Sequence, residues 1–121
     1  MKIKIRKADQ VFSRWVRTRD KWTCQRCHRG YEVGDGRLQC AHCFGRRKES
    51  VRFDPENTAS LCVGCHLFLD QNHEDKRAFF IKRLGEENYN QLMIRSNITA
   101  KKDDKMVVFI YSRLLKEMEN A

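Results

Sequence analysis

All six cysteines of this chain occur in pairs with two residues between them: Cys24–Cys27, Cys40–Cys43 and Cys62–Cys65. A C-x-x-C pair forms a tight knuckle that presents two sulfurs to one ion, and two pairs complete the tetrahedral thiolate site that favours zinc. A zinc ion would also stabilise the modest core expected of 121 residues with 40% hydrophobic side chains. The pairs therefore predict one small domain built around structural Zn²⁺.

The choice of a metal over disulfides depends on the compartment. The N-terminus starts with basic residues but has no apolar stretch behind them, and no apolar run approaches the roughly 18 residues that cross a membrane. We therefore expect a cytoplasmic protein with no secretory signal, no membrane partner and no small-molecule cofactor. In that compartment thiols stay reduced and are available to metals.

One zinc ion needs only four of the six sulfurs, so two assignments are open. Joining the first and third pairs places the last knuckle where a helix is expected to begin, with residues 37–57 as a hairpin between them. Joining the first and second pairs leaves twelve residues between them and is also sterically possible. We favour the first assignment, in which Cys40 and Cys43 are partly buried small hydrophobic residues.

Two of the pairs are followed directly by histidine. Cys24–His28 reads C-Q-R-C-H and Cys62–His66 reads C-V-G-C-H, and both match the signature of covalent haem attachment. A small dihaem cytochrome is therefore a competing interpretation. It is disfavoured because haem attachment normally requires export, and because Phe44 follows the middle pair.

Basic residues are concentrated at the N-terminus. The chain has 25 Lys and Arg against 16 Asp and Glu, and the first thirty residues carry +8 of the net charge of +9. Such clustering is typical of a surface that neutralises nucleic-acid phosphates, although a solubilising surface has the same composition. We expect a nucleic acid as the partner and residues 1–21 as a basic N-terminal arm or helix. The candidate phosphate contacts are Arg14, Arg17, Lys21, Arg46, Arg47, Lys48 and Arg52.

The hydrophobic pattern predicts an α+β domain whose second half is helical scaffold. Asp9 is a candidate N-cap for the first helix, and Trp15 and Trp22 are expected in the core rather than as platforms for bases. The segment 106–111, MVVFIY, could be helix or strand. The expected elements are helices at 9–20, 63–71, 73–84, 86–95 and 103–120, a strand at 37–43, a strand end at 51–53 and a turn at 54–57.

The order of these features resembles the HNH nucleases. The matching residues are His42 in L-Q-C-A-H-C-F, Asn57 in R-F-D-P-E-N and His66 in L-C-V-G-C-H, flanked by C-x-x-C pairs. This match covers residues 22–72. The segment 40–84 is also similar to the NinG recombination proteins of lambdoid phages, which share the strand-end histidine, the R-F-D-x-x-N turn, a C-x-x-C pair and a helix that ends in L-G.

The resemblance implies a small zinc-stapled ββα-metal core over residues 22–72, treble-clef-like, with residues 73–121 as flanking helices. In such a core His42 would be the general base, Asn57 would hold the hairpin turn and orient His42, and His66 would bind a catalytic Mg²⁺ or Mn²⁺ ion. The implied activity is metal-dependent hydrolysis of DNA phosphodiester bonds that nicks one strand. The likeness to NinG adds branched recombination intermediates as substrates.

One position departs from the family pattern. Many HNH enzymes have an aspartate metal ligand directly before the first histidine, whereas this chain has Ala41. Asp70 lies one helical turn after His66 and is a candidate second ligand, although it could equally be a solvated helix residue. His42 has an alternative role as a zinc ligand beside the middle pair. A treble-clef zinc module that binds nucleic acid without cutting it is the competing function.

Overall fold

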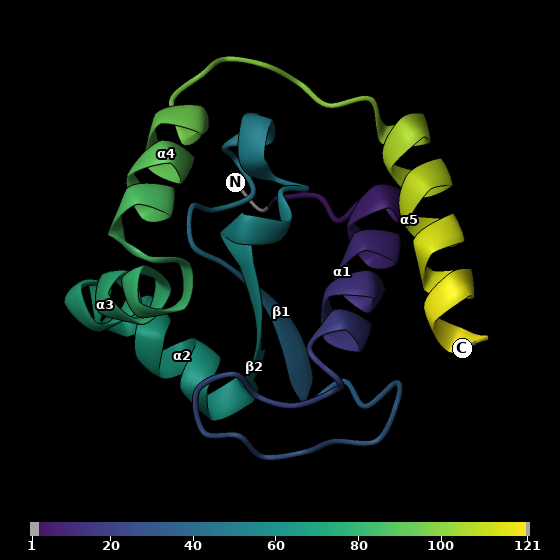
Figure 1. Ribbon diagram of the computed structural model, residues 1–121, viewed down its shortest axis with the longest axis horizontal. Helices are drawn as coiled ribbons and strands as arrows, with labels where there is room; N and C mark the ends of the chain where they lie inside the picture. Colours follow the sequence, from purple (N-terminus) through teal and green to yellow (C-terminus); the bar gives the residue numbers. More distant parts are fainter. Residues whose placement is uncertain (1–2, 121) are drawn as a thin grey trace.

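The computed structural model describes residues 3–120, and within that range the chain is α+β, with five α-helices and one two-stranded antiparallel sheet. Two single-turn 3₁₀ helices, Glu49–Val51 and Pro55–Asn57, lie between the strands. The elements in order are α1 (Lys7–Arg19), β1 (Leu38–His42), β2 (Thr58–Cys62), α2 (Val63–Gln71), α3 (His73–Leu84), α4 (Glu86–Ser96) and α5 (Asp104–Glu119) (Figure 1).

Most of these elements agree with the predicted ones, and the exceptions have local causes. α1 begins two residues early because its N-cap is Arg6, whose backbone N–H donates to the Asp9 carboxylate in the first turn. Asp9 is therefore not the N-cap that the sequence indicated. The expected strand end at 51–53 is instead the end of a 3₁₀ turn, and the ambiguous segment 106–111 is helical within α5.

The strands pair in register from Leu38 opposite Cys62 to His42 opposite Thr58. α2 starts at the residue after β2, so the hairpin leads directly into a helix. Cys62 caps that helix, because its Sγ accepts a hydrogen bond from the backbone N–H of Cys65 at 3.4 Å. The chain thus has a strand–strand–helix order, but its second strand follows the turn at 54–57, whereas the sequence indicated a strand end before that turn, at 51–53.

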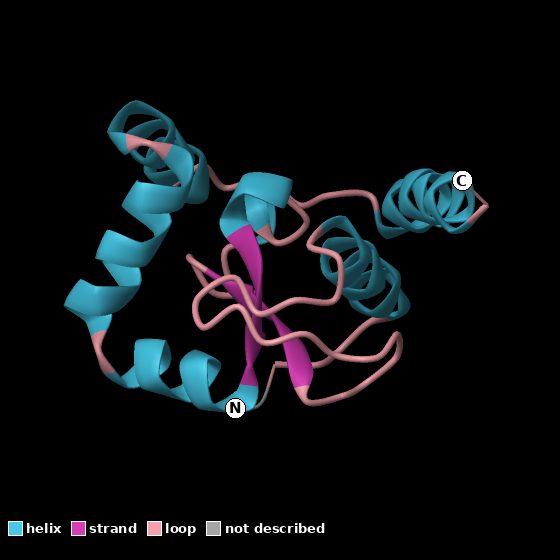
Figure 2. Cartoon of the chain, turned by 60° about the horizontal axis from the view of Figure 1, so that its bottom comes forward, coloured by secondary structure: helices cyan, strands magenta, loops and turns pink. Residues whose placement is uncertain are grey.

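Helices lie on both sides of this hairpin. Figures 1 and 2 show α1 and α5 together on one side, and the connected helices α2, α3 and α4 on the other. On the first side, Phe12 and Val16 of α1 pack with Cys40 of β1. On the second side, Ala41 and Leu69 belong to the cluster that joins the hairpin to α2.

Of the arm or helix expected at residues 1–21, the structure has the helix, α1, and it packs into this core. α1 buries Ala8, Phe12 and Val16 in the core, and of its cations Lys7 is exposed while the three arginines are half-buried. Trp22 is buried beside Cys24, as predicted, and the half-buried Trp15 packs against the core residue Phe12 with ring centroids 5.9 Å apart. Within residues 3–120 no helix combines the length and the apolar character needed to cross a bilayer.

Candidate functional site

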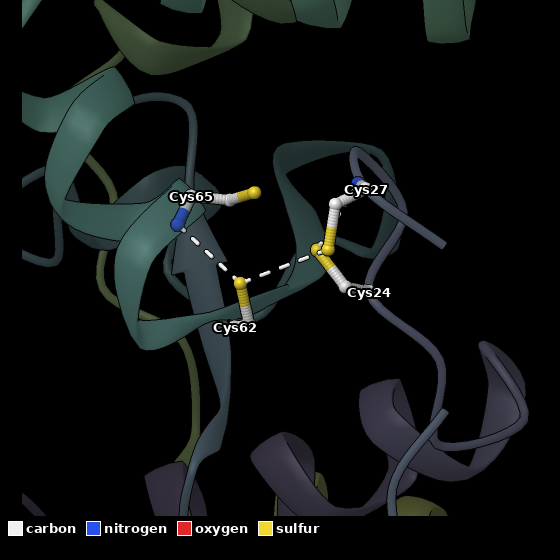
Figure 3. Close-up of side chains that lie close together, drawn as sticks. All are labelled: Cys24, Cys27, Cys62 and Cys65. Carbon is white, nitrogen blue, oxygen red and sulfur yellow. Dashed lines mark hydrogen bonds between the residues drawn. The ribbon is translucent and has the colours of Figure 1, made fainter. Parts of the chain in front are cut away.

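Four cysteine sulfurs converge where the first knuckle meets the start of α2 (Figure 3). The Sγ atoms of Cys24, Cys27, Cys62 and Cys65 all lie within 4.8 Å of one another, and those of Cys27 and Cys62 are 3.9 Å apart. Sulfurs bound tetrahedrally to zinc at about 2.3 Å are about 3.8 Å apart. The four cysteines could therefore hold a structural metal ion such as zinc, and the predicted grouping of the first and third pairs is confirmed.

Backbone N–H groups donate to two of these sulfurs and favour the thiolate form of Cys24. The N–H groups of Cys27 and Cys65 donate to the sulfurs of Cys24 and Cys62, at 3.5 and 3.4 Å. Burial opposes ionisation of Cys24, but backbone N–H groups, that of Cys27 first among them, lower its pKa to about 7. At neutral pH about half of the Cys24 side chains are therefore already thiolates, the form that binds a metal ion.

The middle pair is separate from this cluster. Cys40 is 6% exposed in the apolar cluster under α1, and burial raises its pKa to about 12. Burial also raises the pKa of Cys43, to about 11. Both residues pack as small hydrophobic side chains, as expected.

Within residues 3–120 the four-cysteine cluster is the only group of three or more candidate ligands, so the alternative of His42 as a zinc ligand has no site here. The convergence of the outer pairs also leaves no room for two separate haems.

Asn57 is fully buried and ties the connection between the strands together. Its Oδ1 accepts from the backbone N–H of Phe44 at 2.8 Å, and its Nδ2 donates to the carbonyls of Phe44 and Val51 at 2.8 and 3.0 Å. The side chain thus joins the segment directly after β1 to the segment ahead of β2. This arrangement is the turn-holding role expected for Asn57.

His42 is the last residue of β1 and is 8% exposed. Its Nε2 lies 3.0 Å from the carbonyl oxygen of Arg52. Since a carbonyl can only accept, Nε2 carries the hydrogen and Nδ1 keeps a free lone pair. Burial, reinforced by the guanidinium of Arg46, lowers the pKa of His42 to about 4. At neutral pH the ring is therefore an uncharged imidazole that can accept a proton at Nδ1.

His66, in α2, is fixed in the tautomer that a metal ligand requires. Its Nδ1 donates to Oε1 of Gln39 at 2.8 Å, so the Nε2 lone pair is free and lies 3.4 Å from Oδ2 of Asp70. Two ligands that share one ion at about 2.1 Å are about 3.0–3.4 Å apart. Burial lowers the pKa of His66, which keeps the ring neutral. His66 and Asp70 could therefore bind the same cation.

Other features of the His66–Asp70 pair limit how tightly these two residues could hold an ion. The second oxygen of Asp70 lies 3.0 Å from the ammonium group of Lys76. Ala41 is 1% exposed in the α2 cluster and provides no oxygen. Among the described residues no third histidine, cysteine or carboxylate joins His66 and Asp70. An ion here would complete its coordination with water or substrate oxygens.

His66 also lines a cleft of about 450 Å³ that runs beside β1 between α1 and α2. Arg17 and Arg46 contribute cationic groups to the same cleft, and Gln39 contributes its amide. The positive charge of Arg46 depresses the pKa of both His42 and His66. One guanidinium is thus within electrostatic reach of both histidines.

The other predicted phosphate contacts have different environments. Arg14 pairs with Glu119 on α5, at 3.2 Å, and Lys21 is exposed at the end of α1. Arg47 and Lys48 line a separate cleft of about 370 Å³. The prediction that Arg52 contacts phosphate is wrong. Its side chain is 4% exposed and its guanidinium pairs with the buried carboxylate of Asp9, so it cannot reach a phosphate.

The contact of Gln39 with His66 was missed by sequence reasoning. No motif marks this glutamine, and the contact depends on a strand residue and a helix residue 27 positions apart. Comparisons with protein-family models, with curated proteins and with solved structures find no match. The resemblance to the HNH nucleases therefore stays a hypothesis, and its support comes from the geometry of the site.

Proposed function

We propose that this protein is a metal-dependent endonuclease of the HNH type that hydrolyses DNA phosphodiester bonds, one strand per site. The observation that carries the proposal is the state of His66. Its Nδ1–H is held by Gln39 and its Nε2 faces Asp70 at the edge of a cationic cleft. Metal-binding histidines typically have their second nitrogen fixed in this way.

In this proposal His42 and the residues that line the cleft have complementary chemical roles. His42 is neutral, and its Nδ1 can take the proton from a water molecule that attacks phosphorus. A Mg²⁺ or Mn²⁺ ion held by His66 and Asp70 would stabilise negative charge on the phosphate and on the leaving 3′ oxygen. Arg17 and Arg46 bind the flanking phosphates, and these contacts orient the backbone without reading its sequence.

The four-cysteine cluster supports the same site from outside. It joins the knuckle at 24–27 to the first turn of α2, where Cys65 directly precedes His66. A zinc ion bound there would fix the start of α2, and with it the position of the His66 ring relative to Gln39. Structural zinc thus holds the helix in place, and the divalent ion at His66 takes part in the chemistry.

A second function is favoured by three specific observations. The lysine already paired with Asp70 and the missing donor at Ala41 both weaken an ion site, and His42 is only 8% exposed. A zinc module that binds nucleic acid without cutting it needs none of these groups. It would use the same cysteines and the same basic cleft.

Incubation of supercoiled plasmid with Mg²⁺ or Mn²⁺ separates the two functions. We expect the wild-type protein to convert it to the nicked form, and we expect His42→Ala and His66→Ala to lose that activity. His28→Asn is the matched control, because His28 lies outside the cleft and asparagine tolerates its φ of 66°. Plasmid binding without nicking under either ion would refute the nuclease and support the binding module.

A further inference from the structure

The guanidinium of Arg52 is the most completely bonded charged group around the candidate site. Its five N–H donors have five acceptors: Asp9 Oδ1 at 2.9 Å and Oδ2 at 2.6 Å, Glu49 Oε2 at 3.1 Å, and the carbonyls of Lys4 and Arg46 at 2.9 and 3.2 Å. Only Arg offers a fork with this number of donors. The side chain is therefore held in a single position.

The other half of this contact belongs to α1. Asp9 is 4% exposed in the first turn, and besides both bonds from Arg52 it accepts the backbone N–H of Arg6 at 2.8 Å. Arg46 also has its Nε 3.5 Å from the same carboxylate. Because α1 is itself packed into the core, the carboxylate is a fixed anchor for a loop 43 residues away in sequence.

The backbone of the same arginine orients His42. The Arg52 carbonyl receives the Nε2–H of His42, and the preceding carbonyl, that of Val51, receives the amide of Asn57. The carbonyls of Val51 and Arg52, which follow each other in one turn, are thus bonded by Asn57 and His42, the proposed turn support and base. Asn57 fixes the first of them, and the guanidinium of Arg52 fixes the second through its own backbone.

We propose that Asp9 is a positioning residue that acts on His42 through Arg52. The Asp9 carboxylate holds the Arg52 guanidinium, and Arg52, fixed in this way, presents its backbone carbonyl to His42. That carbonyl keeps the hydrogen of His42 on Nε2 and the lone pair on Nδ1. The tautomer follows from the contacts of the chain itself. The effect of this tautomer on catalysis rests on the proposed nuclease function. Asp9 touches neither the reacting atoms nor His66, so it is not a catalytic residue.

The direct test is the tautomer of His42 in the zinc-loaded protein, read from ¹⁵N-histidine NMR. Wild type should show one tautomer with the hydrogen on Nε2. In Asp9→Asn one acceptor becomes a donor that faces the N–H groups of Arg52, so His42 should show mixed tautomers or transfer its hydrogen to Nδ1. Arg52→Lys keeps the buried charge but loses the fork, and it should give the same change with less risk of unfolding.

Asp20→Asn is the matched control. Asp20 is also buried and accepts hydrogen bonds from Arg19, Arg83 and the backbone of Ser60, but it makes no hydrogen bond to His42 or Arg52. It should lower stability and leave the His42 spectrum unchanged. In the plasmid assay Asp9→Asn should lower kcat about tenfold or more with KM nearly constant.

A single unchanged His42 tautomer in both Asp9→Asn and Arg52→Lys would overturn the proposal, and so would an equal spectral change in Asp20→Asn. These outcomes differ from failure of the nuclease. If wild type does not nick DNA under any ion, the catalytic function falls while the NMR result still decides whether Asp9 orients His42.

Discussion

Replacing Cys62 by serine separates metal binding from the other roles of this residue. Cys62 provides one of the four clustered sulfurs, and its side chain also caps α2 by accepting the N–H of Cys65. Serine is among the preferred N-cap residues, so Cys62→Ser keeps a cap and removes only the metal ligand. Cys40→Ser is the matched substitution, because Cys40 is buried but lies outside the cluster.

The expected magnitudes differ. Structural zinc in small domains contributes about 10–16 kcal/mol of apparent binding free energy, so losing one of four ligands costs about 2.5–4 kcal/mol. That is a large part of a total stability of about 5–15 kcal/mol, and it corresponds to a fall in Tm of about 10 °C or more. Cys40→Ser places a hydroxyl in an apolar cluster, which costs about 1–2 kcal/mol and leaves zinc bound.

The assay combines two measurements on purified protein: zinc content by elemental mass spectrometry, and Tm by circular dichroism with and without a chelator. Wild type and Cys40→Ser should bind one zinc per chain and lose stability when the chelator is added. Cys62→Ser should bind less zinc and respond weakly to chelation. If Cys40→Ser loses its zinc while Cys62→Ser retains it, the assignment of the metal site is wrong.

Three further predictions concern the hairpin and the cleft. Asn57→Ala should lower the free energy of unfolding by about 2–4 kcal/mol in urea titrations, because three backbone groups lose their partner; a value below about 1 kcal/mol would contradict the turn-holding role. Arg46→Gln should weaken DNA binding about tenfold and reduce its salt dependence by about one charge, whereas Lys116→Gln on α5 should not; equal effects of the two would remove the cleft as the binding site. The pKa of His42 is depressed to about 4, so its stabilising effect is present above the unfolded value of about 6.5 and is lost as pH falls toward 4. The loss should be on the order of 3 kcal/mol in pH-dependent unfolding and smaller in His42→Gln; identical pH profiles would contradict a buried neutral ring.

Periodicity and spacing were enough to predict the features that depend on neighbours in sequence. The helices followed from their apolar spacing, and the approach of Asp70 to His66 followed from the helical repeat. Contacts between distant segments could not be predicted in this way. Arg52 looked like a surface cation because nothing near it in the chain shows that Asp9 will meet it across the core. The Gln39–His66 contact likewise required the strand and the helix to be placed in space.

The same distinction explains why α1 was predicted in part. Its apolar face was visible in the sequence, but the +8 charge of the first thirty residues indicated only an arm or helix that binds phosphates. Charge describes the exposed face of a helix and says little about where the opposite face packs. α1 is both a core helix and one wall of the cationic cleft, so its charge and its burial serve the same site.

The pairing of Lys76 with Asp70 is a weaker objection to an ion at His66 than the alanine at position 41. The side chain of Asp70 is 48% exposed and that of Lys76 20%, and an ion pair with one solvated partner is worth on the order of 1 kcal/mol, so the lysine can move aside at modest cost. The missing donor is different, because Ala41 is packed against the α2 cluster and no rearrangement supplies an oxygen there. With two protein ligands, an ion depends on water and phosphate oxygens for the rest of its coordination. The divalent ion should therefore bind weakly without DNA, with an affinity on the order of millimolar, and more tightly once a phosphate enters the cleft.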